Sequence, residues 1–145
     1  MNRPYIICHM VMSIDGKVTG NYLYTPECEA AAEHYYEINR KFHADAYACG
    51  RITMEGSFIP LALEKLKTQF GIQTLLLEGG SILNGSLLKE SLVDQLSLVL
   101  APIVAETGDK PLFYESALTG YELTKASPLE KGCLWLQYES ATMMV

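Results

Sequence analysis

Apolar runs of strand length alternate along the chain with amphipathic segments of helix length. The run Tyr5–Met12 is almost unbroken, which is typical of a strand covered on both faces. Thr25, followed by Pro26 and Glu27, supplies an N-cap, a first-position proline and a first-turn acid, so a helix is predicted from there to about Lys41. The alternation continues, with strands predicted at 44–49, 72–77 and within 93–104, and helices at 61–70 and from 81 to about 90.

The last third of the chain has a different pattern. Residues 121–126 and 133–139 are predicted to be two strands joined through Pro128 and Gly132. Strand–helix repeats followed by such a pair predict a three-layer α/β domain with a mostly parallel central sheet and antiparallel C-terminal edge strands. No linker or internal repeat is visible, so residues 1–145 are expected to form a single domain.

Composition and charge narrow the classes of protein that the chain can be. With 49% apolar and 19% charged residues among 145, the chain can bury a core, which excludes a disordered or fibrous protein. No apolar run approaches the roughly 20 residues that span a bilayer, and the N-terminus lacks a signal-peptide pattern, so we expect no membrane association. The net charge of −6 disfavours nucleic acid as a partner but allows an anionic small molecule that meets a local positive site.

The cysteines and histidines have no metal-ligand spacing. Cys8, Cys28, Cys49 and Cys133 are far apart in the sequence, and none belongs to a C-x-x-C pair. In a chain with this much core we expect reduced, mostly buried thiols, and hence a cytoplasmic protein without a metal site. His9 lies inside an apolar strand, which favours a hydrogen-bonded core histidine over a catalytic one.

The strongest candidate for chemistry is the junction at 78–81, Glu-Gly-Gly-Ser, between a buried strand and a helix. Two glycines let a ligand approach the backbone closely, and the helix that follows offers unpaired N–H groups and a partial positive charge. These features suit a phosphate or pyrophosphate. A tight strand-to-helix turn uses the same residues, although such a turn does not require the carboxylate of Glu78.

Two further junctions carry polar residues after a strand. Gly50, Arg51 and Thr53 form a plausible anion clamp, with an N-capped helix and a solvated arginine as the alternative. Asp15 and Lys17 stand after the first strand, where the alternative is a surface turn. Because ligands of open α/β sheets bind outside the carboxyl ends of the strands, the three junctions together favour a dinucleotide-like ligand laid across several strand ends.

Three segments carry a resemblance to one family. Residues 12–17 (M-S-I-D-G-K) resemble its M-S-x-D-G-K segment, and residues 44–53 resemble its A-D-A…G-R-x-T segment. Residues 76–102 are similar to its L-x-x-E-G-G…L-V-D-E-L…A-P block. The family is the C-terminal reductase domain of bacterial bifunctional riboflavin-biosynthesis deaminase/reductases, within the dihydrofolate reductase-like superfamily. The resemblance covers most of residues 3–105.

The resemblance implies a dihydrofolate reductase-like fold and an NADPH-dependent reductase, often a homodimer. The expected reaction is hydride transfer to a pyrimidine- or pterin-like small molecule, similar to 5-amino-6-(5-phosphoribosylamino)uracil reductase of riboflavin biosynthesis. It makes Asp15 the candidate catalytic residue, which would orient or protonate the substrate. The implied cofactor-binding residues are Gly50, Arg51, Thr53, Glu78, Gly79, Gly80 and Ser81. The implied substrate-binding residues are Ser13, Gly16, Lys17 and Thr25.

The chain also departs from the family pattern. An arginine-containing segment that grips the substrate phosphate, and a strand that follows it, are missing near residues 58–61. Either this is a trimmed reductase with a different substrate, or a segment of the natural chain is omitted. A dihydrofolate reductase and a non-catalytic nucleotide-binding dimeric homologue remain as alternatives.

Overall fold

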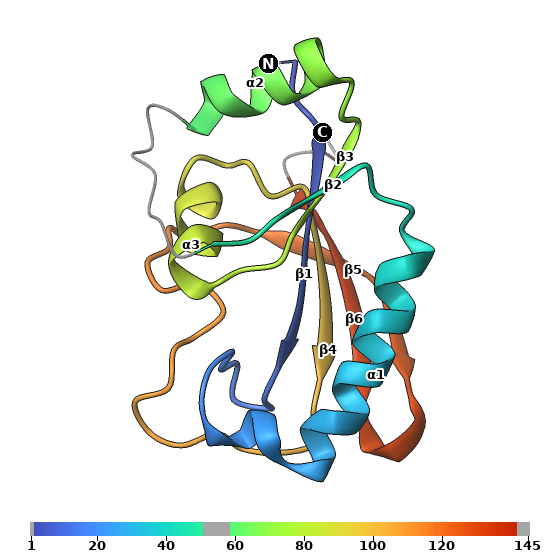
Figure 1. Cartoon of the computed structure of the whole chain (residues 1–145). Coiled ribbons are helices and arrows are strands. Elements are labelled where there is room, and N and C mark those ends of the chain that lie inside the picture. The colour runs from blue at the N-terminus through green and yellow to red at the C-terminus, as the bar shows by residue number, and fades with distance from the viewer. Residues whose placement is uncertain (1, 51–58, 142–145) are drawn as a thin grey trace.

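Strand β1 (Tyr5–Met12) lies in the middle of a six-stranded sheet in the computed structural model, which describes residues 2–50 and 59–141. It pairs in parallel with β3 (Thr74–Leu77) on one side and with β4 (Gln95–Leu100) on the other. The short strand β2 (Ala46–Ala48) extends the parallel part beyond β3. Because helices cover both faces of this part of the sheet, β1 needs the unbroken apolar sequence that it has (Figure 1).

The C-terminal strands form the antiparallel edge. Strand β6 (Leu134–Ser140) pairs antiparallel with β4, and β5 (Tyr121–Pro128) pairs antiparallel with β6. The strand order is therefore β2-β3-β1-β4-β6-β5. This arrangement confirms the prediction of a mostly parallel central sheet with antiparallel C-terminal edge strands.

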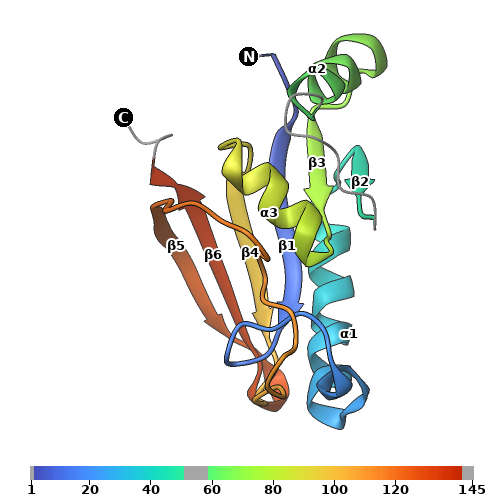
Figure 2. The ribbon, with the colours of Figure 1, turned by 90° about the vertical axis from the view of Figure 1, so that its left-hand side faces the viewer.

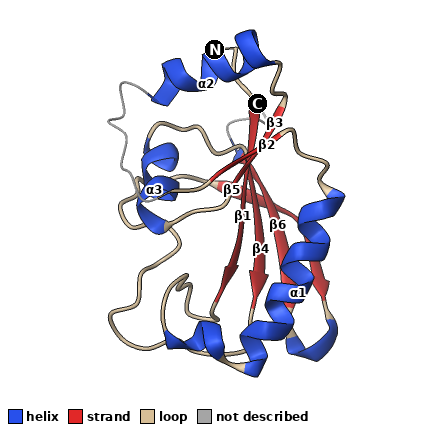
Figure 3. Ribbon diagram, viewed as in Figure 1, coloured by secondary structure: helices blue, strands red, loops and turns tan. Residues whose placement is uncertain are grey.

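The three helices of the described residues make the outer layers of the fold. Helix α1 (Pro26–Lys41) lies on one face of the sheet and α3 (Ser81–Lys89) on the other, as Figures 2 and 3 show. Helix α2 (Ile59–Phe70) shares an apolar cluster with α3 through Leu63 and Leu87. Short 3-10 helices lie at Asn21–Tyr24 and Glu130–Gly132. No helix within the described ranges is long and apolar enough to cross a membrane.

The strands do not all end at the same height. The pairing of β3 with β1 stops where Leu77 lies opposite Cys8, whereas β4 stays paired with β1 up to Met12, opposite Leu100. Four residues of β1 therefore project past the end of β3, which is about 13 Å at 3.3 Å per residue. This step separates the turn after β1 from the junction after β3.

A buried polar cluster joins α1 to the sheet. His9 is fully buried, its Nδ1 lies 2.9 Å from the Ser97 hydroxyl, and its Nε2 lies 3.0 Å from the Tyr35 carbonyl oxygen. Burial lowers the pKa of His9, so the ring is neutral at neutral pH. Its ring stacks on that of Tyr35 with centroids 4.1 Å apart. The prediction of a hydrogen-bonded core histidine is confirmed.

The thiols follow the sequence expectation as well. Cys8, Cys28 and Cys133 are buried, and Cys49 is exposed at the end of β2. All four are free thiols, which confirms that they are mostly buried and not paired.

Candidate functional site

The junction between β3 and α3 combines a close backbone approach with an open helix start. Gly79 has φ +85°, a backbone conformation that favours glycine, and a Cβ added there would lie 2.9 Å from Cε of Met10. Gly80 is the N-cap residue of α3, and a Cβ there would meet nothing within 4 Å. The N-cap position of α3 therefore has open space beside it, where a helix start has unpaired backbone N–H groups.

A cavity of about 380 Å³ lies at this helix start. We call it the glycine cavity, and its lining residues are Thr19, Gly50, Gly80, Ser81, Ile82 and Lys110. Gly50 comes from the end of β2, and its N–H donates to the Gly79 carbonyl over 3.0 Å. Two of the junctions singled out in the sequence thus meet in one cavity. Arg51 and Thr53, predicted beside Gly50, lie outside the described residues, as does Phe58 at the start of the segment expected to be missing.

Lys110 is a residue that sequence reasoning missed. Its carbonyl accepts from the Val18 N–H, and its own N–H donates to Thr19 Oγ1, both over 2.8 Å. The Ser81 hydroxyl donates to the carbonyl of Pro111 over 2.6 Å. These bonds fix the backbone of Lys110 beside the N-terminus of α3. The lysine side chain and the helix N-terminus each supply positive charge. The Ser81 hydroxyl is used by the fold, so Ser81 has its backbone N–H to offer to an anion.

A second cavity, of about 250 Å³, lies on the α1 side of the same junction. We call it the acidic cavity, and its lining residues are Met10, Val11, Val18, Leu23, Cys28, Ala32, Tyr35, Tyr36 and Glu78. Asn39 Nδ2 donates to Oε1 of Glu78. Burial, followed by the nearby charge of Glu78, raises the pKa of Tyr35, so its hydroxyl stays protonated. Glu78 is thus placed in a different cavity from Gly80 and Ser81, although the three are close in sequence.

The turn after β1 is closed on itself. Ser13 is fully buried, its hydroxyl donates to Oδ1 of Asp15 over 2.6 Å, and it accepts from the Lys17 N–H over 2.9 Å. The Ala105 N–H also donates to Oδ1 of Asp15, over 3.0 Å. The bond from Ala105, followed by that from Ser13, lowers the pKa of Asp15. Gly16 has the positive φ of +81° that closes this turn.

These placements separate the residues of the first junction from the two cavities. Among the described residues, neither lining includes Ser13, Asp15, Gly16 or Lys17, whereas the next two residues along the chain line one cavity each. Thr25 is the N-cap of α1, where its Oγ1 accepts from the Cys28 N–H over 3.3 Å. In this structure the turn orders the segment that reaches the cavities, and its carboxylate is held ionised.

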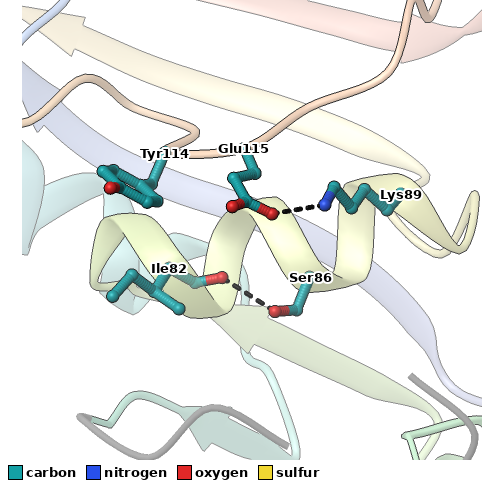
Figure 4. Close-up of a pocket in the computed structure, with 5 residues that line it drawn as sticks. All are labelled: Ile82, Ser86, Lys89, Tyr114 and Glu115. Carbon is teal, nitrogen blue, oxygen red and sulfur yellow. Dashed lines mark hydrogen bonds and ion pairs between the residues drawn. The ribbon is translucent and has the colours of Figure 1, made fainter. Parts of the chain in front are cut away.

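A third cavity, of about 240 Å³, lies along α3 and the segment that packs on it. Figure 4 shows Lys89 paired with Glu115 over 2.5 Å, beside Tyr114, Ile82 and Ser86. Among the described residues, none of those predicted from the sequence lines it.

The family model of the RibD C-terminal domain matches residues 29–134, well over half of the chain. The chain belongs to this family. Its fold resembles RibD of Acinetobacter baumannii, with a TM-score of 0.75 and 12% identity over 97% of this chain and 59% of that one. This RibD family member therefore spans less than two thirds of that protein's length. Comparison with curated protein sequences gives no match.

Two other solved structures are similar over nearly their full length. The riboflavin biosynthesis reductase of Saccharomyces cerevisiae gives a TM-score of 0.64 at 14% identity, covering 97% of this chain and 91% of that one. The dihydrofolate reductase of Enterococcus faecalis, complexed with NADP(H), gives 0.65 at 11% identity, covering 94% and 96%. Together they confirm the predicted dihydrofolate reductase-like fold.

Proposed function

We propose that this member of the RibD C-terminal domain family is an NADPH-dependent reductase. It transfers a hydride to a pyrimidine- or pterin-like small molecule, in the manner of 5-amino-6-(5-phosphoribosylamino)uracil reductase. The observation that supports this best is the pair of cavities on either side of Gly79. One has the groups to hold phosphates, and the other has an apolar wall with a single carboxylate.

The glycine cavity fits the pyrophosphate of a dinucleotide. Gly80 leaves the space that a Cβ would fill, the start of α3 provides N–H donors, and Lys110 provides a cation. When bound, NADPH would supply the hydride. We assign Gly50, Gly80, Ser81 and Lys110 to the cofactor, with Arg51 and Thr53 carried over from the family resemblance.

The acidic cavity is assigned to the substrate. Glu78, held by Asn39 and facing the protonated hydroxyl of Tyr35, can accept hydrogen bonds from a ring and so fix its orientation. The apolar wall that includes Met10 offers a surface for the face of a flat ring. Asp15 is a positioning residue in this proposal, because its ionised carboxylate fastens the turn that leads into both cavities.

The experiment begins with cofactor binding. NADPH should raise the melting temperature of the purified protein, since a ligand specific for the folded state stabilises it. Candidate pyrimidines and pterins should then cause loss of NADPH absorbance. The absence of any stabilisation by NADPH would refute the cofactor assignment. Stabilisation without turnover of any substrate would favour the non-catalytic nucleotide-binding homologue instead.

The assembly is part of the same proposal. We propose that residues 1–145 fold as a single domain and pair as a homodimer, the usual state of the family that the sequence resembles. Light scattering of the purified chain measures this directly, and a mass of one chain, 16.1 kDa, would contradict the dimer.

A further inference from the structure

Buried hydrogen bonds cross the sheet from β6, through β4 and β1, to α1. The indole N–H of Trp135 on β6 donates to the hydroxyl of Ser97 on β4 over 2.9 Å. The same hydroxyl lies 2.9 Å from Nδ1 of His9 on β1, and Nε2 of His9 lies 3.0 Å from the Tyr35 carbonyl oxygen. Both His9 and Ser97 are fully buried. We call Trp135, Ser97, His9 and Tyr35 the cross-sheet network.

The direction of each bond in the network follows from two groups that act in one way only. An indole N–H can only donate, and a backbone carbonyl can only accept. Because the Ser97 oxygen accepts from Trp135, its own proton is available to Nδ1 of His9. A bare Nε2 would place two acceptors, the ring nitrogen and the Tyr35 oxygen, 3.0 Å apart. The network therefore fixes His9 as the tautomer with its proton on Nε2.

The ring of His9 is also held by aromatic side chains. It stacks on the ring of Tyr35 at an angle of 4°, with centroids 4.1 Å apart. The ring of Phe42 meets it edge-on at 73°, with centroids 5.4 Å apart. His9 thus contacts Tyr35 at two points, the backbone carbonyl and the ring, and fixes both.

Tyr35 connects the cross-sheet network to the acidic cavity. Its side chain lines that cavity, and its hydroxyl is hydrogen-bonded to Glu78. Trp135, at the other end of the network, lies outside the described lining of the cavity. A side chain of β6 is therefore linked to the cavity wall by hydrogen bonds and a ring contact.

We infer that His9 is a positioning residue for the substrate: Trp135 and Ser97 fix the tautomer of its ring, and the ring fixes Tyr35 in the wall of the acidic cavity. The inference rests on the proposed function, which assigns this cavity to the substrate. It gives the buried histidine a part in ligand binding without contact between its ring and the ligand.

Variants of His9 separate its hydrogen bonds from its volume. His9→Phe keeps a ring and removes both bonds, whereas His9→Gln places an amide N–H about where Nε2 lies and keeps the donor to Tyr35. Calorimetry on the NADPH-saturated protein measures the affinity for two probes, dihydropterin and 5-amino-6-(5-phosphoribosylamino)uracil. For the probe that the wild type binds more tightly, His9→Phe should weaken binding about fivefold to tenfold, the size of one hydrogen bond, and His9→Gln should recover most of the loss. The affinity for NADPH should stay unchanged in both variants.

A histidine of α1 provides the matched control. His34 is the neighbour of Tyr35, and its Nε2 also lies near a backbone carbonyl oxygen, that of Glu130 at 3.1 Å, but in an exposed position. His34→Phe should leave the affinities for the probe and for NADPH unchanged.

The single tryptophan of the chain gives a spectroscopic readout. Its indole N–H gives one signal in a proton–nitrogen correlation spectrum. Without ligand, His9→Phe should already move this signal, because the Ser97 hydroxyl loses its acceptor. In the wild type the probe should shift the signal, and Ser97→Ala, which removes the link between Trp135 and His9, should abolish that shift.

The outcomes separate the inference from the proposed function. An equal loss of probe and NADPH affinity in His9→Phe, no recovery in His9→Gln, or an indole signal that does not respond to the probe would overturn the inference. If His9→Phe does not fold, Ser97→Ala replaces it in the affinity comparison, with the same expected loss for the probe alone. Binding of NADPH without binding of either probe also overturns the inference, whereas a wild-type protein that does not bind NADPH refutes the proposed function, and the inference with it.

Discussion

At Gly85, in the middle of α3, helix propensity and side-chain packing predict opposite effects of a glycine-to-alanine substitution on stability. In an isolated helix, replacing an interior glycine by alanine stabilises by about 1 kcal/mol. In this fold Gly85 is buried, and a Cβ there would lie 2.4 Å from the carbonyl oxygen of Glu115 and 3.1 Å from its backbone nitrogen. Ordinary contacts of a Cβ are 3.4–4 Å, so about 1 Å of overlap with backbone must be relieved.

The neighbouring segment cannot withdraw freely to relieve that overlap. The Tyr114 N–H donates to the Ser81 carbonyl over 3.2 Å, and Asn84 Nδ2 donates to the Leu112 carbonyl over 3.1 Å. Overpacking of this kind costs roughly 1–3 kcal/mol, and the upper end applies because backbone has to move. After the propensity gain of about 1 kcal/mol, Gly85→Ala should lower the free energy of unfolding by about 1–2 kcal/mol.

Urea unfolding followed by circular dichroism measures the effect. For a chain of this size the expected loss corresponds to a decrease in melting temperature of about 2–8 °C. Ser86→Ala is the control on the same helix, because the Ser86 hydroxyl bonds only to the Ile82 carbonyl one turn earlier in the hydrogen bonds of the described structure. That variant should stay within about 0.5 kcal/mol of the wild type. A Gly85→Ala protein at least as stable as the wild type would refute the packing argument.

Three further predictions concern charge. Lys110→Met should weaken NADPH binding about fivefold, the effect of one exposed ion pair, and NADPH binding to the wild type should weaken as salt is added. Lys125→Met, on β5, is the control and should leave NADPH affinity unchanged. An equal loss of affinity in both variants would contradict the assignment of Lys110 to the cofactor. Asp94→Ala removes the carboxylate that accepts hydrogen bonds from Arg3 and from the Ile6 N–H, so the free energy of unfolding measured in urea should fall by about 2–3 kcal/mol. A loss under about 1 kcal/mol would argue against the importance of this ion pair. Because the pKa of Asp15 is lowered in the folded state, its carboxylate stabilises the fold fully above the unfolded pKa near 4, and this stabilisation declines as the pH falls further. The free energy of unfolding of Asp15→Asn should therefore differ most from that of the wild type near pH 7, and the two should converge in acid. A difference that stays constant with pH would speak against the carboxylate bonds.

The strands could be predicted from the sequence because burial on both faces leaves a clear apolar run. The exact ends of the strands could not be predicted, because side chains there take hydrogen bonds that a neighbouring strand would otherwise make. Strand β3 is predicted from residue 72 but begins at Thr74, and β2 is predicted over 44–49 but covers only Ala46–Ala48. The carboxylate of Asp45 accepts the N–H groups of Gln73 and Thr74, over 2.9 and 3.0 Å. A side-chain acceptor thus takes the backbone donors that a longer strand would have used.

The glycine junction was also predictable from the sequence, because a Glu-Gly-Gly-Ser turn before a helix has a direct physical meaning. The division of its residues between two cavities was not. Successive side chains at a strand end point to opposite faces, and Glu78 follows the α1 face, where Asn39 donates to it. From the sequence alone, Glu78 and Gly80 are expected to bind the same ligand because they are only two residues apart.

The step in the sheet explains why Lys110 was not found. Strands β1 and β4 extend four residues past the partner positions of β3, so the segments that follow them begin far from the start of α3. Both segments fold back toward α3 as a pair, joined by the bridge between Lys17 and Pro111 and by the bonds at Lys110 (Figure 1). Lys110 is brought to the glycine cavity by its hydrogen bonds to Val18 and Thr19, which are about ninety positions away in the sequence. A contact at such a distance leaves no periodic pattern in the sequence. The turn closed by Asp15 stands at the base of this pair, so a residue that lines neither cavity can still set the position of the groups that do.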